Sequence, residues 1–275
     1  MSETATAAKP KAAAHGRPIW YELMTPDPAA VAPFYKATLG WDIAPGTATA
    51  SGHPYAMIGR ADGGMAGGVL TLTAGMQEQG GKPIWLPYFH VADVAAAAAR
   101  AKQLGASVHM GPTDIGVGTV AMLADPQGAP FYLMDPVPPP DRPDAESDVF
   151  KAQVPGHAWW NELETTDEPG ATAFYTALLG WSAERTMPMG DKGDYRFVEA
   201  GGEPIGAINP WMADYMAVGW LPYFGVADID AARAAAEANG GTVTHDVHEV
   251  PGGDFIFTAT DPAGAPVGFV GPKGA

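Results

Sequence analysis

The sequence contains no cysteine among its 275 residues. This absence excludes disulfide bonds, thiolate nucleophiles, cysteine-based zinc sites and iron–sulfur clusters. Basic residues are also scarce, since 15 Lys and Arg face 31 Asp and Glu and leave a formal net charge of −16. Such a charge repels phosphate backbones and anionic lipids, so neither nucleic acid nor a membrane surface is an expected partner. No apolar run reaches the roughly 20 residues that a membrane-spanning helix needs.

The rest of the composition is that of a folded globular protein. Apolar residues make up 47% of the chain, and 8 Trp, 9 Tyr and 10 Phe need a core in which to pack. At the N-terminus, Lys9 and Lys11 follow the first alanine run and no apolar core comes after them. This order is the reverse of a secretory signal, so we expect a cytoplasmic protein.

The two halves of the chain repeat one another. Four motifs recur in the same order: Trp20-Tyr21-Glu22-Leu23 as Trp160-Asn161-Glu162-Leu163, Phe34-Tyr35 with Leu39-Gly40-Trp41 as Phe174-Tyr175 with Leu179-Gly180-Trp181, Trp85-Leu86-Pro87-Tyr88-Phe89 as Trp220-Leu221-Pro222-Tyr223-Phe224, and Asp125-Pro126 as Asp261-Pro262. Such ordered agreement indicates a tandem duplication. A Pro-rich, acidic stretch separates the halves and is typical of a linker. We therefore expect a mobile tail at 1–15, a first domain at 16–137, a linker at 138–155 and a second domain at 156–275.

Each half is expected to contain the same unit of strand, helix and three strands twice. In the first half, strands are predicted at 18–24, 42–44, 55–58, 65–72, 86–91, 107–110, 118–124 and 130–134, with helices that begin at Asp27 and Asp93 and end near Gly40 and Gly105. The glycine pairs 63–64, 67–68 and 201–202 are interpreted as hairpin turns. Strands and helices that follow one another without strict alternation favour an α+β fold over a doubly wound sheet.

This order of motifs resembles the vicinal oxygen chelate superfamily, which includes glyoxalase I, extradiol dioxygenases and bleomycin-binding proteins. The two-half form with Trp-x-Glu-Leu near each start is similar to a subgroup of glyoxalase-like proteins, many of which are labelled hydroxylases. The resemblance covers 17–137 and 156–272. It implies four β-α-β-β-β modules, paired into two curled half-barrels that each hold a cavity.

The resemblance also implies where a metal would bind, because metal-dependent members take a His, Gln or Glu ligand from each of three strands. The matching positions are Trp20, Leu86 and Tyr132 in the first half and Trp160, Leu221 and Gly268 in the second. None of these residues suits a divalent metal, so we expect neither the usual metal triad nor another cofactor. A displaced site using Glu22 and His90 is hard to build, because His90 lies about 13 Å along its strand from Leu86 and Glu22 only about 7 Å from Trp20. The second half has Gly225 in place of His90.

A glutamate in the middle of an apolar strand is unusual, and it occurs in both halves, as Glu22 and Glu162. Side chains alternate along a strand, so each glutamate faces the cavity together with the tryptophan two residues before it. Burial beside an indole raises the pKa of a carboxyl group, which suits acid–base catalysis near neutral pH. The alternative is a structural carboxylate paired with an arginine such as Arg17.

Aromatic residues complete the predicted sites. Trp20, Trp160 and Tyr132 would form flat walls for an aromatic ligand, or else would simply fill the places of metal ligands. Tyr88 and Tyr223 lie on the same strand face as Leu86 and Leu221 and would offer hydroxyl groups, with core packing as the alternative. His90 lies on that face as well and is the remaining candidate for ligand binding.

These residues predict a protein for small molecules, which either binds an apolar or aromatic ligand or performs metal-independent acid–base chemistry with Glu22 and Glu162. Two alternatives stay open. One is a metal-dependent lyase, isomerase or dioxygenase with a rearranged site, and the other is a non-enzymatic regulatory protein. Because both halves lie in one chain, we expect a monomer or a homodimer.

Overall fold

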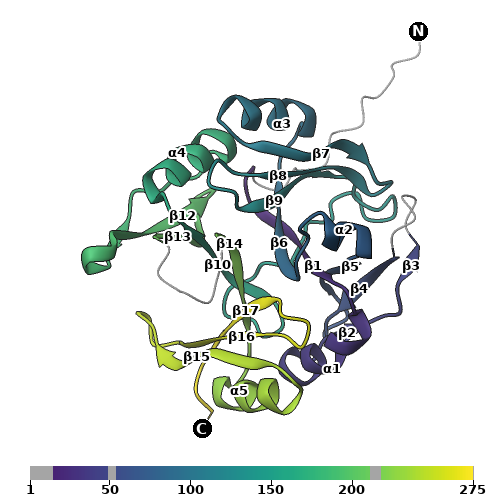
Figure 1. Ribbon diagram of the computed structural model, residues 1–275, viewed down its shortest axis with the longest axis vertical. Helices are drawn as coiled ribbons and strands as arrows, with labels where there is room; N and C mark the ends of the chain where they lie inside the picture. Colours follow the sequence, from purple (N-terminus) through teal and green to yellow (C-terminus); the bar gives the residue numbers. More distant parts are fainter. Residues whose placement is uncertain (1–14, 49–53, 211–217, 275) are drawn as a thin grey trace.

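The computed structural model describes residues 15–48, 54–210 and 218–274. Within these residues the chain forms two curled sheets, one from each half (Figure 1). The tail expected at 1–15 lies outside the described residues, except for His15. None of the described helices is long and apolar enough to cross a membrane.

The first half forms one sheet from both of its modules. Its elements are β1 (Pro18–Thr25), α1 (Pro28–Leu39), β2 (Asp42–Ile43), β3 (Thr47–Ala48), β4 (Pro54–Gly59), β5 (Met65–Thr71), α2 (Ala74–Glu78), β6 (Ile84–His90), α3 (Val94–Gln103), β7 (Ser107–Asp114), β8 (Gly118–Ala124) and β9 (Pro130–Pro136). The strand order is β2-β4-β5-β1-β6-β9-β8-β7, with β3 paired to β4. The modules meet where β1 runs antiparallel to β6.

The second half repeats this arrangement with eight strands in its sheet instead of nine. Its elements are β10 (Ala158–Thr165), α4 (Glu168–Leu179), β11 (Thr186–Pro188), the short 3-10 helix η1 (Gly190–Lys192), β12 (Asp194–Ala200), β13 (Glu203–Pro210), β14 (Gly219–Gly225), α5 (Ile229–Ala238), β15 (Thr242–Glu249), β16 (Phe255–Thr260) and β17 (Pro266–Gly271). The order β11-β12-β13-β10-β14-β17-β16-β15 matches the first sheet. The predicted α+β fold, a tandem duplication with two modules in each half, is confirmed.

Local signals explain where the helices begin and end. Asp27 caps α1 by accepting hydrogen bonds from the N–H groups of Ala29 and Ala30, and Gly40 ends the helix with a φ of 70°. The short helix α2 was not expected, because five residues are too few to show a helical period. Its N-cap is Thr73, which accepts from the N–H of Met76.

The glycine pairs have two different roles. Gly63 and Gly64 lie in the turn between β4 and β5, as predicted, but Gly67 and Gly68 lie inside β5 and the turn assigned to them is wrong. A β-carbon at Gly67 would overlap the carbonyl oxygen of Tyr21, and one at Gly68 would overlap the hydroxyl of Tyr55. Both glycines therefore allow neighbouring atoms to approach β5 closely: the Tyr21 carbonyl at Gly67 and the Tyr55 hydroxyl at Gly68.

Alternation along the strands divides each sheet into two faces. On β1, Tyr21 and Leu23 belong to a large core that both halves share and that includes the helices. Tyr88 and Tyr132 belong to a separate cluster on the opposite face, which we call the inner face of the first sheet. The inner face of the second sheet carries Tyr223 in the same way. The shared core makes the halves a single packed unit.

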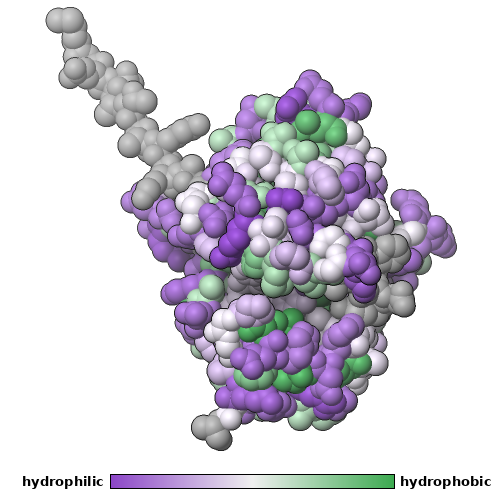
Figure 2. Space-filling model, turned by 90° about the vertical axis from the view of Figure 1, so that its left-hand side faces the viewer, coloured by the Kyte–Doolittle hydropathy of each residue, from purple (hydrophilic) through white to green (hydrophobic). Residues whose placement is uncertain are grey.

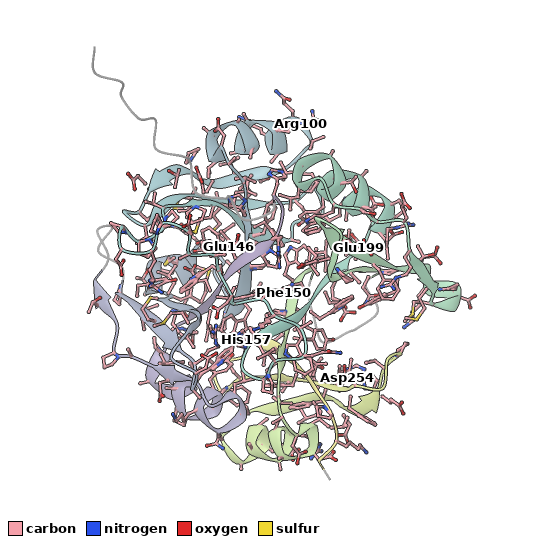
Figure 3. All side chains as sticks on the ribbon, turned by 180° about the vertical axis from the view of Figure 1, so that it is seen from behind. Arg100, Glu146, Phe150, His157, Glu199 and Asp254 are labelled. Atoms are coloured by element: carbon pink, nitrogen blue, oxygen red, sulfur yellow. The ribbon has the colours of Figure 1, made fainter. Side chains whose placement is uncertain are left out.

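The halves exchange contacts at the helices and the linker. Helix α1 packs against α5, and α3 against α4, so each helix pair joins the two halves (Figure 1). In the connecting segment, Val149 and Phe150 are buried, and Phe150 forms a bridge with Ala158. Phe150 and His157 lie near the middle of the molecule (Figure 3).

Candidate functional site

Glu162 stands on the inner face of the second sheet, in the middle of β10. Its neighbours across the strands are Leu221 on β14 and Ala207 on β13. The carboxylate is half-buried, and its Oε2 accepts a hydrogen bond from the hydroxyl of Tyr223 at 2.8 Å. Glu162 is thus held by a phenol on the next strand and still reaches solvent.

Three aromatic rings surround this carboxylate on one side. The indole Nε1 of Trp160 donates to the hydroxyl of Tyr195 at 2.8 Å, and that hydroxyl also hydrogen-bonds Glu162. Phe197 packs edge-on against both Trp160 and Tyr195. The guanidinium of Arg185 lies over the Phe197 ring, 4.1 Å from its centre. All of these rings are half-buried, so they form a wall that a ligand can reach.

A second carboxylate follows on the same face of β10. Glu164 is 4% exposed and pairs across the sheet with Asn209 of β13, whose Nδ2 donates to Glu164 Oε1 at 2.8 Å. Burial raises the pKa of Tyr195, and the charges of Glu162 and Glu164 raise it further. The inner face of the second sheet is therefore acidic at its centre.

Burial raises the pKa of Glu162 above its ordinary value. Hydrogen bonds from Tyr223 and Tyr195 and the charge of His248 act in the opposite direction. His248 lies on β15 and is exposed, and a charge on it lowers the pKa of Glu162. The result is a carboxyl group that can exchange a proton closer to neutral pH than a solvent-exposed glutamate does.

The first sheet carries the same arrangement in a closed form. Glu22 is 2% exposed, and its Oε2 accepts from the hydroxyl of Tyr88 at 2.8 Å, while its Oε1 has no hydrogen-bond partner among the described residues. Burial raises the pKa of Glu22 to about 7, against hydrogen bonds from Tyr88, Tyr132 and Tyr55 that lower it. Trp20 Nε1 donates to Tyr55 at 2.9 Å, as Trp160 does to Tyr195.

Side chains of the first half fill much of this inner face. Tyr88 and Tyr132 stack with their ring centres 4.2 Å apart, and both are at most 6% exposed. Several apolar side chains pack around them: Ile19, Met24, Leu70, Leu72, Met76, Ile84, Leu86, Met110, Val120, Met122 and Met134. Met76 comes from α2, so this helix helps to close the first site.

The strand register shows how the two faces have diverged. The first sheet pairs Met24 with Leu70 where the second pairs Glu164 with Asn209. The first sheet also has Tyr132 where the second has Gly268, and a β-carbon there would overlap the ring of Tyr223. At these positions the second inner face is therefore more polar than the first, and the Tyr223 ring packs directly on Gly268.

Two sequence candidates lie apart from the carboxylates. His90 is buried at the end of β6, and its pKa is lowered by burial and affected by Asp135 and His15. No described interaction links it to Glu22. Arg17 forms its ion pair with Glu203 at 2.7 Å, so it is not the partner of Glu22.

Five residues of the two sites are not indicated by the sequence motifs: Tyr55, Tyr195, Phe197, Glu164 and Asn209. Tyr55 and Tyr195 lie at the same offset of 140 residues as the paired tryptophans, so the repeat contained a signal for them. Glu164 lies on the same strand face as Glu162, but its counterpart in the first half is Met24 and the repeat therefore concealed it.

The surface around the second sheet is uneven. Figure 2 looks onto the side of the molecule where the second sheet lies and shows mainly hydrophilic residues, with hydrophobic ones between them. The half-buried Glu162 and its aromatic neighbours belong to this sheet.

Comparison with known proteins accounts for the shared architecture. Residues 20–134 match the glyoxalase-like domain family, and residues 157–269 match the glyoxalase/bleomycin resistance protein/dioxygenase superfamily. The "Putative glyoxylase CFP32" of Mycobacterium tuberculosis is 30% identical over 251 residues, which are 91% of this chain and 92% of that protein. The chain belongs to the glyoxalase/bleomycin resistance protein/dioxygenase superfamily.

Other members of the superfamily are similar over most of their length. The anthracycline biosynthesis protein DnrV of Streptomyces peucetius is 31% identical over 263 residues, covering 87% of this chain and 88% of that protein. Among solved structures, the Mn(II)-bound glyoxalase from Novosphingobium aromaticivorans has a TM-score of 0.62 at 15% identity, over 94% of this chain and 82% of that one. At that identity the structural likeness shows the fold alone.

The residues at the superfamily's metal positions do not fit a metal ion. The inner faces present an indole, an isobutyl group and a phenol in the first half, at Trp20, Leu86 and Tyr132. In the second half, Leu221 is buried and the Tyr223 ring covers Gly268, which has no side chain. These groups offer no set of oxygen or nitrogen ligands for a divalent cation.

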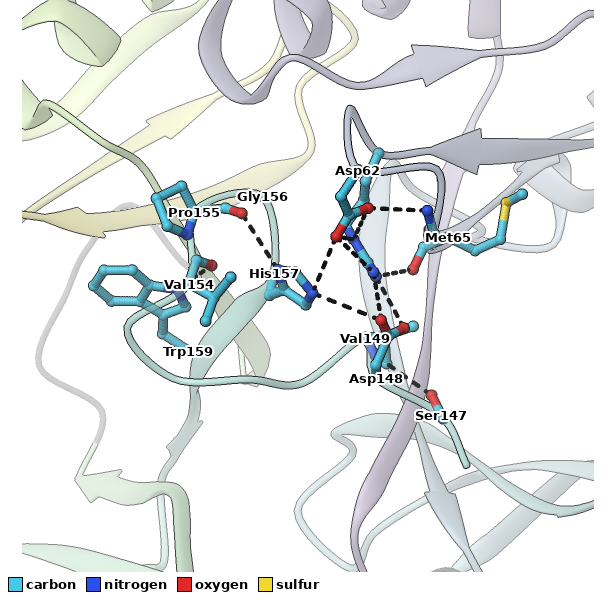
Figure 4. Close-up of polar contacts among 12 residues, drawn as sticks. Asp62, Met65, Ser147, Asp148, Val149, Val154, Pro155, Gly156, His157 and Trp159 are labelled. Atoms are coloured by element: carbon cyan, nitrogen blue, oxygen red, sulfur yellow. Dashed lines mark hydrogen bonds and ion pairs between the residues drawn. The ribbon is translucent and has the colours of Figure 1, made fainter. Parts of the chain in front are cut away.

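One group among the described residues could in principle hold a cation, and it lies elsewhere. Asp62, Asp148 and His157 place ligand atoms within 4.8 Å of one another, between the two halves (Figure 4). The guanidinium of Arg60 already forms ion pairs with both carboxylates. This arrangement therefore ties the β4–β5 turn to the connecting segment, and the Arg60 guanidinium already occupies both carboxylates.

Proposed function

We propose that this protein binds a small, flat aromatic molecule on the inner face of the second sheet and anchors it with Glu162 in place of a metal. The observation that carries the proposal is the half-buried Glu162 carboxylate, held by Tyr223 at 2.8 Å beside the accessible Trp160 ring. One carboxylate oxygen is fixed by the phenol, so the group is oriented before a ligand arrives.

The aromatic wall supports a flat ligand. Trp160, Tyr195 and Phe197 offer ring faces and edges, on which planar molecules stack. The name of the relative DnrV points the same way, because anthracyclines contain fused planar rings. We take an anthraquinone as the test compound for this reason.

The chemistry of the site is acid–base. Glu162 in its ionised form accepts a hydrogen bond, or a proton, from a hydroxyl group of the ligand, and its raised pKa favours that exchange near neutral pH. Tyr223 and Tyr195 keep the carboxylate in place. No step needs a metal, in keeping with the residues at the metal positions.

We assign Glu22 to a closed counterpart of this site. Tyr88 corresponds to Tyr223, and the pair of Trp20 and Tyr55 corresponds to Trp160 and Tyr195. Glu22 itself is buried by side chains of the first half. Tyr132 stacks on Tyr88 at the register position where the second half has Gly268, on which the Tyr223 ring packs. Ligand binding at the second sheet does not require this closed site to open.

Titration of the full chain with 2-(hydroxymethyl)anthraquinone, followed by quenching of tryptophan fluorescence, tests the proposal. We expect saturable quenching, and Glu162→Gln should weaken binding by about tenfold, since a hydrogen bond to a charged group contributes about 1.5–3 kcal/mol. Glu237→Gln is the matched control, because Glu237 pairs with Arg233 on α5 and lies far from the inner face. Equal affinities for wild type, Glu162→Gln and Glu237→Gln would contradict the proposal.

A further inference from the structure

We propose that the ligand of the second inner face carries a protonated amine beside its aromatic body, with Glu162 and Glu164 as the counter-charges. This inference rests on the proposed function and names the chemical class of its ligand. It starts from the strand pattern, which places the two carboxylates two residues apart on the same face of β10. The hydroxyl of Tyr195 accepts from the Trp160 indole and hydrogen-bonds Glu162, and the charge of Glu164 also acts on it.

A buried amide gives a second and independent indication. Asn209 is 6% exposed, and its Nδ2 donates to Glu164. Its Oδ1 has no hydrogen-bond partner among the described residues. A buried acceptor without a partner is unusual in a folded protein, and a ligand with N–H groups would satisfy it.

The polar groups that line this face are mostly acceptors. The Asn209 amide N–H donates to Glu164, and the Tyr223 hydroxyl donates to Glu162. An ammonium group has three donors and no acceptor, so it complements a carboxylate and an amide oxygen together. A carboxylate on the ligand would instead meet two like charges.

The nearby arginines already have partners and do not neutralise the carboxylates of this face. Arg196 is engaged with Glu168, and Arg185 lies over the Phe197 ring. His248, whose charge would act on Glu162, is an exposed side chain on β15. The net charge of −16 also draws cations toward the protein as a whole.

The first sheet shows that the fold itself does not require these polar groups. At the positions of Glu164 and Asn209 it has Met24 and Leu70, which pair in the same register and pack in an apolar cluster. The acidic pair is therefore a property of the second face alone, as expected for residues that recognise a ligand.

Three anthraquinones that differ only in charge test this inference: 2-(aminomethyl)anthraquinone, 2-(hydroxymethyl)anthraquinone and anthraquinone-2-carboxylate. We expect the amine to bind the full chain about tenfold or more tightly than the alcohol near neutral pH and low salt, and the carboxylate to bind most weakly. Glu164→Gln keeps the shape of the side chain and an oxygen for Asn209. It should remove most of the preference for the amine and change the affinity for the alcohol by no more than about twofold.

The outcomes separate this inference from the proposed function. If the alcohol binds in a Glu162-dependent way and the amine binds no more tightly, the ligand class is wrong and the site stands. The control Glu237→Gln should keep the preference for the amine. If Glu164→Gln keeps that preference as well, the inference is overturned. If none of the three compounds binds, both proposals fail. The comparison of the three compounds on wild-type protein decides the matter even where the Glu164 variant does not fold.

Discussion

The hydroxyl of Tyr35, in the first half, donates a hydrogen bond to Asp261 Oδ2, in the second half, at 3.0 Å. The reverse pair, Tyr175 and Asp125, makes the same bond at 3.1 Å. Each aspartate also accepts from the backbone of its own Asp-Pro turn. The repeated motifs therefore join the halves across an approximate twofold relationship, and the tyrosines serve the interface rather than the inner faces.

Loss of one of these hydroxyls should destabilise the whole chain. Tyr35→Phe removes the partner of Asp261 and of the Trp85 indole, which donates to Tyr35 at 2.8 Å. We expect the free energy of unfolding to fall by about 1–3 kcal/mol, since buried polar groups lose their partners. Urea denaturation followed by circular dichroism measures this change.

The corresponding variant in the second half, Tyr175→Phe, provides the comparison for that experiment. Tyr175→Phe should cost a similar amount, because Tyr175 bonds Asp125 and Trp220 in the same way. Both variants should still unfold in one transition, since the core is shared. Two separate transitions would show that the halves are independent and would contradict this view of the interface.

The stability of the protein should depend on the ionisation of Glu22. Its carboxyl has a pKa of about 7 in the folded chain and an ordinary value of 4.5, so the folded state binds the proton more tightly. The free energy of unfolding should therefore decrease as pH rises from about 4.5 to about 7, by on the order of 3 kcal/mol.

A comparison of wild type with Glu22→Gln isolates this contribution, because the other titrating groups are common to both proteins. Glutamine keeps an oxygen for Tyr88 and cannot ionise. Its stability relative to wild type should rise between pH 5 and pH 8. A difference that stays constant over this range would show that Glu22 does not titrate there.

The close approach at Gly68 should be sensitive to a single methyl group. In Gly68→Ala the added β-carbon would overlap the Tyr55 hydroxyl, and the ring would have to leave Trp20 and Glu22. Overpacking of this kind costs about 1–3 kcal/mol. Gly75→Ala on α2 is the control, because nothing lies near its β-carbon position, and it should be neutral or slightly stabilising. Thermal unfolding of the two variants would reveal the difference, and equal melting temperatures would refute it.

Metal removal should leave the protein intact. The superfamily's metal positions lack a ligand set, and Arg60 already forms ion pairs with both Asp62 and Asp148. We expect protein purified without chelators to hold less than stoichiometric divalent metal by mass spectrometry, and EDTA to leave its Tm unchanged. A stoichiometric metal whose removal lowers the Tm would reverse this assignment and direct attention to lyase and dioxygenase chemistry.

The sequence predicted the order of elements well because the decisive signals are local. Asp27 and Gly40 lie directly next to the ends of α1 that they mark. The duplication shows each of these signals in both halves. The role of Gly67 and Gly68 could not be found in this way, because a glycine that permits a turn and one that permits a close approach have the same local pattern. Only the contact with a distant side chain such as Tyr55 distinguishes them.

The same limit applies to the site. Strand parity was enough to place Glu162 and Tyr223 on one face, and strand pairing brings them within hydrogen-bond distance. The partner of Trp160 is Tyr195, which lies 35 residues away on a strand that does not adjoin β10. Glu164 was missed because the repeat was used as the guide, and function that arises after a duplication appears where the copies differ.

The unequal depth of the two glutamates fixes how many molecules one chain can hold. Glu22 is enclosed by its own half, and Glu162 is within reach of solvent. A titration should therefore end at one equivalent of ligand per polypeptide, with a simple hyperbolic curve. The first half would then act as a scaffold that supports the second, and only one of the two copies would bind the ligand.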